Sequence, residues 1–298
     1  MVDPLTEVIS LLQPGTVVSK GISGAGRWAV RYSRFGQPSF CAVLEGACRL
    51  VVDGHEPLML AAGDFVLMPA TPGFTMSGFE PARAKRIDPN RAAASAGELR
   101  HGNPDGPPDV RLLGGYFVFG AADAALLVSL LPQLAHVRGE TRLATVVQLV
   151  ADESGEQRPG RDLVLTRLIE VLLIEALRST TGATASPGLL RGLADDRLAA
   201  ALRQMHENPG RAWTVEQLAR QAALSRSAFF ERFSRCVGLA PMAYLQTWRM
   251  ALARKLLRTD RVALADVAER VGYSSASTFS TAFSRHVGQP PARYARSR

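Results

Sequence analysis

Two segments near the C-terminal end of the chain, residues 214–241 and 263–291, match each other along their length apart from one extra residue in the second. Both carry hydroxyl and guanidinium side chains at related positions, which include Ser225, Arg226, Arg235, Ser275 and Arg285. Arginine makes forked hydrogen bonds to phosphate groups and to the edge of guanine, and serine hydroxyls cap helices or bond to phosphate. These residue types therefore indicate the binding of a polyanion.

The positive charge of the chain is concentrated in the same region. From Arg191 onward there are 18 Lys and Arg against 8 Asp and Glu, a net charge of +10, whereas the preceding residues have 17 against 19, a net charge of −2. Base bias in a genome can raise the arginine content, but it does not explain why acidic residues are sparse only at this end. Such a field neutralises phosphates and releases their counterions, so a nucleic acid is the expected partner.

The elements that must position these side chains are pairs of short helices. Apolar residues recur at helical spacing in each segment. The first set is Val215, Leu218, Ala219, Ala222, Phe229 and Phe233, and the second is Leu264, Val267, Ala268, Val271, Phe279 and Phe283. Ala223 and Gly272 fall where a tight turn is needed, and Ser225 and either Ser274 or Ser275 follow as helix caps. Each segment is predicted to be a helix-turn-helix.

A single pattern of this kind can also be a packed helical pair without a partner, or one unit of a helical solenoid. A solenoid needs about three or more repeats to bury a continuous core, and this chain has two. The duplication and the charge together favour double-stranded DNA as the partner.

The last hundred residues resemble the DNA-binding domain of the AraC-type bacterial transcription regulators. The matching features are two motifs with unequal turns, the segment PMAYLQTWRMALARKLL (241–257), the VGY of 271–273 and the ending FSRHVGQPPARY (283–294). The resemblance implies motifs at about residues 214–238 and 263–288, joined by a long helix over Met242–Arg258. It also implies that the second helix of each motif enters one of two successive major grooves.

The resemblance assigns DNA contacts by position. The base-facing residues are Ser227, Phe230, Glu231, Ala276, Ser277 and Thr281, the phosphate-facing arginines are Arg226, Arg235 and Arg285, and Ser225 and Ser275 lie beside them. Glu231 can accept from a cytosine amino group, and Phe230 can touch a thymine methyl group or, alternatively, pack against the domain surface. Few of these residues are strong bidentate readers, so we expect DNA shape to contribute to specificity.

The N-terminal half has the pattern of short strands separated by turns. Within residues 40–70, Glu45–Gly46 and Asp53–Gly54 are turn signals between apolar runs, and Gly63–Asp64 precedes a further strand. A small antiparallel barrel fits this pattern, and LAAGDFVLMP (60–69) resembles the cupin-like sensor domain of many AraC-type regulators. The expected fold class is α+β, with a cupin-like β-barrel and trailing helices followed by an all-α domain of two helix-turn-helix motifs joined by a long helix.

Many cupins are metalloenzymes, which need about three clustered His, Asp, Glu or Cys ligands. The five histidines are scattered, only His55 lies in the strand-rich region, and Phe74 stands where metal-binding relatives often have histidine. We therefore expect no metal, no cofactor and no catalytic residues. The competing hypothesis is a cupin-type enzyme, with or without a metal, that carries an accessory DNA-binding domain.

An apolar pocket in the barrel is the expected place for a small-molecule effector. Its candidate lining residues are Phe40, Val43, Leu50, Phe65 and Phe74. The same residues could instead simply fill the barrel, and no charged anchor for a ligand stands out.

The cysteines, Cys41, Cys48 and Cys236, are odd in number and fit neither a metal site nor a disulfide framework. We interpret them as small buried residues. If Glu45–Gly46 closes a two-residue hairpin, Cys41 and Cys48 become diagonal neighbours on one face, so a redox switch is an alternative.

Helical apolar spacing follows the barrel over residues 126–134, 143–151 and 161–179. The last of these segments has a broad apolar stripe formed by Leu165, Leu168, Ile169, Leu172, Leu173, Ala176 and Leu177. The stripe is either intramolecular core or, as the resemblance implies, a homodimer interface, which we favour. A linker over residues 181–190 then separates a sensor and dimerisation domain (1–180) from a DNA-binding domain (191–298).

The sequence thus predicts a sequence-specific transcription regulator, not an enzyme. Its expected partners are promoter or operator DNA and a second copy of the chain, with RNA polymerase as a further candidate. No apolar run reaches the roughly 18 residues of a membrane span, and the N-terminus lacks a basic start followed by an apolar core, so we expect a cytoplasmic location. No motif specifies the effector, the promoter, or activation as against repression.

Overall fold

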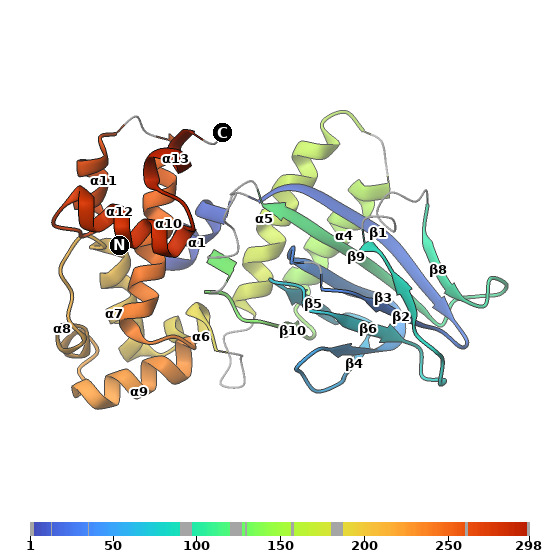
Figure 1. The fold of residues 1–298 in the computed structure, drawn as a ribbon. Helices are drawn as coiled ribbons and strands as arrows, with labels where there is room; N and C mark the ends of the chain where they lie inside the picture. The colour runs from blue at the N-terminus through green and yellow to red at the C-terminus, as the bar shows by residue number, and fades with distance from the viewer. Residues whose placement is uncertain are drawn as a thin grey trace. The chain divides into compact units, whose positions relative to one another are not determined.

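The computed structural model forms two compact units that do not follow the order of the chain (Figure 1). The sheet unit comprises residues 13–125 and 132–186, and the helical unit comprises residues 1–12, 126–131 and 187–298. The residues that the structure describes are 3–12, 14–34, 36–89, 97–119, 127–128, 130–155, 158–179, 187–259 and 262–296.

One long strand, β3 (Ser39–Val52), organises the sheet unit, because it pairs with β4, β5, β6 and β9. The other strands are β1 (Pro14–Ala25), β2 (Ala29–Tyr32), β4 (Leu58–Ala61), β5 (Phe65–Met68), β6 (Phe74–Ser77), β7 (Lys85–Ile87), β8 (Leu99–Gly102), β9 (Val110–Phe119) and β10 (Ala135–Val137). The strand order is β7-β2-β6-β3-β9-β1-β8, with β4 and β5 also on β3 and β10 on β5. The sheet curls around an apolar core, which confirms the predicted cupin-like half of the fold.

The hairpin expected at Glu45–Gly46 is wrong, because β3 runs through these residues as one strand. Gly46 has a φ of +72° and lies one residue after a register shift against β9, which falls between Val43 and Glu45. A Cβ on Gly46 would lie 1.9 Å from the carbonyl oxygen of Asp109, and the Gly46 carbonyl already accepts from the amide of Ala62. The glycine therefore permits close approach of a neighbouring strand at a bulge, and the chain does not reverse.

The other two turn signals are confirmed. The amide of His55 donates to the carbonyl of Val52 across the Asp53–Gly54 turn, and Gly54 has a φ of +81°. At the second turn, the amide of Asp64 donates to the carbonyl of Ala61, and β5 follows.

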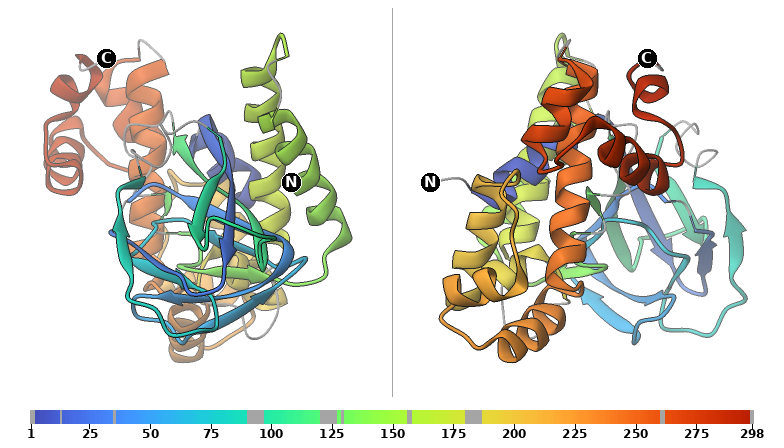
Figure 2. Two further views of the ribbon diagram at one scale, coloured as in Figure 1. Left: turned by 90° about the vertical axis from the view of Figure 1, so that its right-hand side faces the viewer. Right: turned by 60° about the vertical axis from the view of Figure 1, so that its left-hand side comes forward.

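Two helices, α4 (Thr141–Gly155) and α5 (Arg161–Arg178), pack on each other and against β1 (Figure 2). Both were predicted, with longer bounds for α4 than expected. The apolar stripe predicted on α5 is buried except for Leu168, which is half-buried. This stripe belongs to the core, and the apolar side chains that the two helices expose are different ones: Leu149, Leu163, Val164 and Val171.

The helical unit contains the two predicted motifs on either side of a long helix. Its helices are α1 (Pro4–Leu12), α6 (Leu189–Leu193), α7 (Asp196–Glu207), α8 (Val215–Gln221), α9 (Arg226–Val237), α10 (Pro241–Thr259), α11 (Leu264–Arg270), α12 (Ala276–Val287) and α13 (Pro291–Arg296). Residues 181–186 of the expected linker lie outside the described residues.

The first helix of the chain, α1, packs in the helical unit against α7 and α10, which the sequence did not indicate. It buries Leu5, Val8 and Leu12 there. Beside it, Glu7 Oε2 lies 2.8 Å from Nδ1 of the buried His206 of α7. The N-terminal segment is therefore part of the core that supports the first motif.

Candidate DNA-binding surface and effector pocket

The first motif is built as its sequence predicts. Thr214 and Gln217 form a capping box at the start of α8, in which each side chain accepts from the other's backbone amide. Ala223 turns the chain with a φ of +50°, a left-handed conformation that non-glycine residues rarely adopt. Ser225 then caps α9 by accepting from the amide of Ala228. These contacts satisfy backbone N–H groups that have no partner within their helices.

Aromatic packing anchors one face of α9, and the opposite face is open to solvent. Phe229 and Phe233 are fully buried, and the ring of Phe233 meets Tyr244 of α10 edge-on at a centroid distance of 5.8 Å. Phe230 is 45% exposed, so about half of its surface is accessible to solvent. The residues predicted to contact DNA from this motif are all exposed: Ser225, Arg226, Ser227, Phe230, Glu231 and Arg235.

The second motif repeats this construction. Ser275, and not Ser274, caps α12 by accepting from the amide of Thr278, and Gly272 turns the chain with a φ of +81°. The turn is one residue longer than in the first motif, as predicted, since it spans residues 271–275 instead of 222–225. Of the predicted contact residues, Ser275, Ser277, Thr281 and Arg285 are exposed and Ala276 is half-buried.

The start of α11 differs from its counterpart in the first motif. Its N-cap is Ala263, which makes no side-chain hydrogen bond, whereas the corresponding Thr214 completes a capping box. The second motif therefore lacks one of the polar contacts that define the helix start in the first.

One arginine of α9 has a structural role that sequence reasoning missed. Arg232 Nε lies 2.5 Å from Oδ2 of Asp195, the N-cap of α7. Burial disfavours the charged form of Asp195, but the hydrogen bonds from Arg232 and from two backbone amides outweigh it and lower the pKa of this carboxyl. The ion pair ties α9 to α7, and Arg226 and Arg235 are the arginines of α9 that are exposed.

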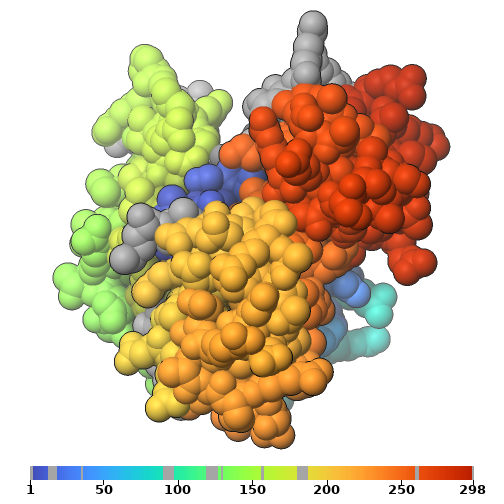
Figure 3. All heavy atoms as spheres, turned by 90° about the vertical axis from the view of Figure 1, so that its left-hand side faces the viewer, coloured from blue at the N-terminus to red at the C-terminus, as the bar shows by residue number. Residues whose placement is uncertain are grey.

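Both motifs contribute surface on one side of the helical unit. Figure 3 shows this side, with the first motif in gold to orange and the second in red. Two motifs that contact one duplex must both be accessible from the same direction. The geometry of this unit meets that requirement.

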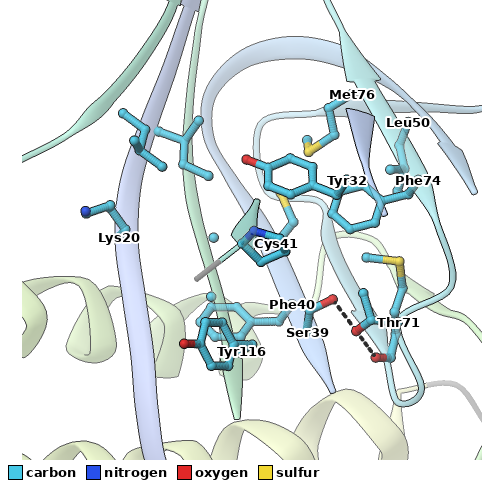
Figure 4. A pocket seen from close by; sticks show the side chains of 16 residues that line it. Lys20, Tyr32, Ser39, Phe40, Cys41, Leu50, Thr71, Phe74, Met76 and Tyr116 are labelled. Atoms are coloured by element: carbon cyan, nitrogen blue, oxygen red, sulfur yellow. Dashed lines mark hydrogen bonds between the residues drawn. The ribbon is translucent and has the colours of Figure 1, made fainter. Parts of the chain in front are cut away.

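A cavity of about 90 Å³ lies inside the curled sheet (Figure 4). Three of the five predicted lining residues, Phe40, Leu50 and Phe74, are in its wall. The other two, Val43 and Phe65, instead line a second cavity of about 170 Å³ that is bounded by α4. The predicted set is therefore divided between two cavities.

Few polar groups face the first cavity. The Tyr32 ring stacks on Phe74 with centroids 4.8 Å apart, and its hydroxyl points into the cavity (Figure 4). Burial raises the pKa of Tyr32 to about 12, so this hydroxyl is neutral at pH 7. Thr71 Oγ1 donates to Ser39 Oγ at 2.8 Å, and the Lys20 amine points away from Tyr32 and Phe74. The cavity suits a mainly apolar ligand with one hydrogen-bonding group.

The cysteines are buried and carry free thiols, which confirms the expectation for Cys41, Cys48 and Cys236. Burial raises the pKa of the Cys41 thiol well above its ordinary value and that of Cys48 to about 12. Protonated thiols are poor nucleophiles. Because β3 is one strand, the hairpin geometry that suggested a redox pair is also absent.

Within the described ranges, no three His, Cys, Asp or Glu side chains gather into a group that could hold a metal ion. His136 Nε2 lies 3.2 Å from Asp64 Oδ2, but the same carboxylate oxygen accepts from the amide of Ala61 and lies 3.4 Å from Arg138 Nε. These contacts fix the turn before β5. His55 is half-buried beside its turn.

The fold and the two motifs define a class of protein in which a cupin-like sheet precedes a pair of DNA-binding helix-turn-helix motifs. A family model described as cupin matches residues 3–182, and one described as a helix-turn-helix domain matches residues 218–297. An AraC-like transcription regulator of Streptomyces lividans is 38% identical over 98% of this chain and 97% of its own length. A second, from Streptomyces antibioticus, is 38% identical over 98% of each chain. The chain therefore belongs to the family of AraC-like transcription regulators.

Two solved structures align with parts or most of this chain. The DNA-binding domain of AdpA, crystallised with a target DNA, is 31% identical over 33% of this chain and 88% of that chain, with a TM-score of 0.31. ToxT from Vibrio cholerae is 12% identical over 94% of this chain and 96% of its own, with a TM-score of 0.36. In the part of the chain that the structure covers, no helix is both long and apolar enough to cross a membrane.

Proposed function

We propose that this DNA-binding transcription regulator reads a specific promoter site with α9 and α12, and that its sheet unit binds a small apolar effector. The observation that carries the proposal is the duplicated motif with two solvent-exposed helix faces. Proteins with two such helices contact successive major grooves and thereby gain both affinity and register. The AraC-like relatives are named as transcription regulators, which agrees with this role.

The proposed contacts divide into two kinds. Arg226, Arg235 and Arg285 bind phosphate and position the protein, while Ser225 and Ser275 support them at the two helix starts. Base edges are read by residues with short or apolar side chains together with Glu231, so DNA shape supplies part of the specificity. The proposed base readers are Ser227, Phe230, Glu231, Ala276, Ser277 and Thr281.

Selection of fragments from the source genome by the full-length protein tests this function. We expect a small number of enriched fragments, each with two short conserved sequence elements about one helical turn apart. Enrichment of all duplexes to the same extent would indicate a nonspecific architectural protein instead. Retention of no fragment at moderate ionic strength would refute the proposal.

The cavity inside the sheet is the proposed effector site. Its lining by Phe40, Leu50 and Phe74, with the Tyr32 hydroxyl directed inward, favours a small aromatic or short aliphatic molecule that carries one hydrogen-bonding group. A ligand present at a hundred times its Kd stabilises the folded protein by about 2.7 kcal/mol.

This site can be tested by thermal unfolding with a panel of such molecules. We expect at least one to raise the Tm of the wild-type protein, and Leu50→Phe, which fills the cavity, to abolish the shift. Leu50→Met conserves the volume and should retain it. Equal shifts in the wild type and in Leu50→Phe would place the ligand elsewhere.

Two further parts of the proposal concern assembly. We propose that the protein forms homodimers through the exposed apolar residues of α4 and α5, and that it acts in the cytoplasm, where promoter DNA and RNA polymerase are found. Exposed apolar side chains gathered on one helical pair are typical of protein interfaces.

A further inference from the structure

The helix α10 is bonded to the segment that leads into the first motif. Arg249 Nε donates to the carbonyl oxygen of Pro209 at 2.7 Å, and its Nη2 donates to the carbonyl oxygen of Arg211, also at 2.7 Å. Both acceptors are neutral. The guanidinium is about half-buried, and this burial lowers the pKa of Arg249. The guanidinium thus contacts two backbone carbonyl groups of one loop. Its planar group fixes the directions of both hydrogen bonds, whereas a lysine ammonium would leave these directions less well defined.

The same face of α10 also holds the turn of the second motif. Gln246, three residues before Arg249, donates from Nε2 to the hydroxyl of Tyr273 at 2.7 Å. Gly272 lies against the guanidinium so closely that a Cβ on it would be 2.6 Å from Arg249 Nη2 and 2.8 Å from the carbonyl oxygen of Gly210. The turn that contains Gly272 and the loop that contains Gly210 therefore lie against each other at these two glycines. The Arg249 side chain connects both segments to α10.

Each of these segments leads directly to a helix of its motif. The loop 208–213 is held closed by Trp213, whose buried indole donates from Nε1 to the carbonyl of Asn208, and it ends next to Thr214, the N-cap of α8. The turn 271–275 ends at Ser275, the N-cap of α12. A displacement of either segment would consequently displace one motif relative to the other. We call Gln246, Arg249, the loop 208–213 and the turn 271–275 the motif bracket.

We propose that Arg249 is a positioning residue that fixes the separation of α9 and α12, and that it thereby sets the number of base pairs between the two sequence elements that the protein reads. This inference rests on the DNA-binding function proposed above. The chain connection through α10 limits how far apart the motifs can be, whereas the motif bracket selects one arrangement. Sites held by a rigid support discriminate against displaced partners, and loss of that support relaxes the discrimination.

The first test measures spacing preference with the full-length protein. The probes are the duplex recovered by genomic selection and two derivatives with one base pair inserted or removed between its two conserved elements. We expect the wild type to bind the derivatives about tenfold more weakly. Arg249→Met should bind both derivatives within about threefold of the original duplex. Lys255→Met removes an exposed charge from the same helix and should behave as the wild type.

The second test requires no DNA, so it separates the motif bracket from the proposed function. Nitroxide labels are placed on Ser227→Cys and Ser277→Cys, which are equivalent positions of α9 and α12. Pulsed electron paramagnetic resonance then measures the distance between the two helices. The native thiols are buried and remain outside the labelling reaction. We expect a narrow distance distribution in the doubly labelled protein that keeps Arg249. The same labelled protein with Arg249→Met should give a broadened or shifted distribution.

Tyr273→Phe provides a milder variant in case Arg249→Met does not fold. It removes one hydroxyl from the motif bracket and should give an intermediate broadening and an intermediate spacing penalty. An unchanged distance distribution and an unchanged spacing penalty in both variants would overturn the proposal. If the wild type selects no DNA site, the proposed function fails, while the distance measurement still decides the role of Arg249.

Discussion

Two exposed residues of α9 are expected to affect DNA binding in different ways. Arg226→Ala removes a phosphate contact, so binding should weaken for all sequences and the slope of log K against log salt should decrease in magnitude by about one. Glu231→Ala should instead change the base preference at a single position, by about 1–3 kcal/mol. Anisotropy titrations at several salt concentrations, with the selected site and single-base variants, measure both effects.

The matched control for these variants is Arg86→Ala, which removes an exposed arginine of β7 in the sheet unit. It should leave the salt slope and the base preference as in the wild type. An unaltered salt slope in Arg226→Ala would remove this residue from the set of phosphate contacts.

The pH dependence of stability should report on His206. Its Nδ1 faces Glu7, its Nε2 lies 2.7 Å from the Tyr244 hydroxyl, and its ring stacks on Trp248. Burial lowers the pKa of His206, an effect larger than the opposing influence of Glu7 and Asp3. The neutral ring satisfies both partners, with Nδ1–H as donor and Nε2 as acceptor.

Because the folded pKa of His206 lies below the unfolded value of about 6.5, the unfolded chain binds more protons below that pH. The contribution of His206 to the free energy of unfolding should therefore be constant above pH 6.5. It should fall as the pH is lowered from 6.5 toward the folded pKa of His206. Urea unfolding at pH 7.5 and 5.5 measures this change. His206→Gln does not titrate and should show a smaller decrease than the wild type; an equal decrease would assign the effect to other groups, such as His101 and His286, whose pKa values are also lowered.

Local signals in the sequence predicted the contacts that span only a few residues. Ser225 and Ala223 were placed correctly, and the cap of α12 was narrowed to Ser274 or Ser275, because caps and tight turns depend on neighbouring backbone groups. The contact between Glu7 and His206 joins residues 199 positions apart, and that between Arg232 and Asp195 joins residues 37 apart. Tertiary packing alone brings such pairs together, so no spacing in the sequence could have indicated them.

At the scale of the helix, the uncapped start of α11 offers a test of how the second motif is stabilised. Ala263 has the extended backbone of an N-cap, with φ −62° and ψ 146°, but no side chain that can accept from the following amides. Ala263→Ser should supply this acceptor and raise the free energy of unfolding by about 1 kcal/mol. Thr214→Ala, at the equivalent position of the first motif, should lower it by a similar amount.

Denaturant unfolding of both variants measures these changes, and the salt dependence of DNA binding should remain that of the wild type in Ala263→Ser. A destabilising Ala263→Ser would mean that the hydroxyl does not reach the amides at the start of α11. The comparison is matched, because the two positions are equivalent in the duplicated motif and differ in whether a cap is already present.

The predicted hairpin at Glu45–Gly46 is wrong because a glycine signal alone does not distinguish a turn from a bulge. Glycine at Gly46 and at Gly54 has positive φ in both cases, yet only Gly54 reverses the chain. The difference lies in the neighbours: Gly46 approaches the backbone at Asp109, 63 positions away, and pairs with β9. A turn and a bulge both favour glycine, and only the partner strand distinguishes them.

At the scale of the whole chain, the two units are interleaved in sequence, since the first twelve residues belong to the helical unit and the strand β1 that follows belongs to the sheet unit. Composition and motifs in a sequence assign continuous stretches of the chain to domains. They therefore could not separate α1 from the strands that follow it. The same reading recovered the fold class, because the duplicated motif and the alternating strands are each continuous in sequence.

The apolar residues that α4 and α5 leave exposed predict the state of association. Leu163 is 64% exposed and Val171 is 41% exposed, although both lie on a helix whose other apolar face is buried except for the half-buried Leu168. Covering such side chains with the same surface of a second copy removes apolar area from water in a two-fold symmetric interface. We therefore expect a homodimer at micromolar concentration by light scattering after size-exclusion chromatography.

Leu163→Asp combined with Val171→Asp should convert this dimer to a monomer, because a dimer would then bury two carboxylates without partners in each subunit. Met59→Asp, a change of the same kind at an exposed apolar residue of β4, should leave the mass unchanged. The monomeric variant should still bind one copy of the two-element site through its own helical unit, with the loss confined to sites that contain two such copies. A wild-type protein with the mass of a single chain, or a double variant that remains dimeric, would show that α4 and α5 do not form the interface.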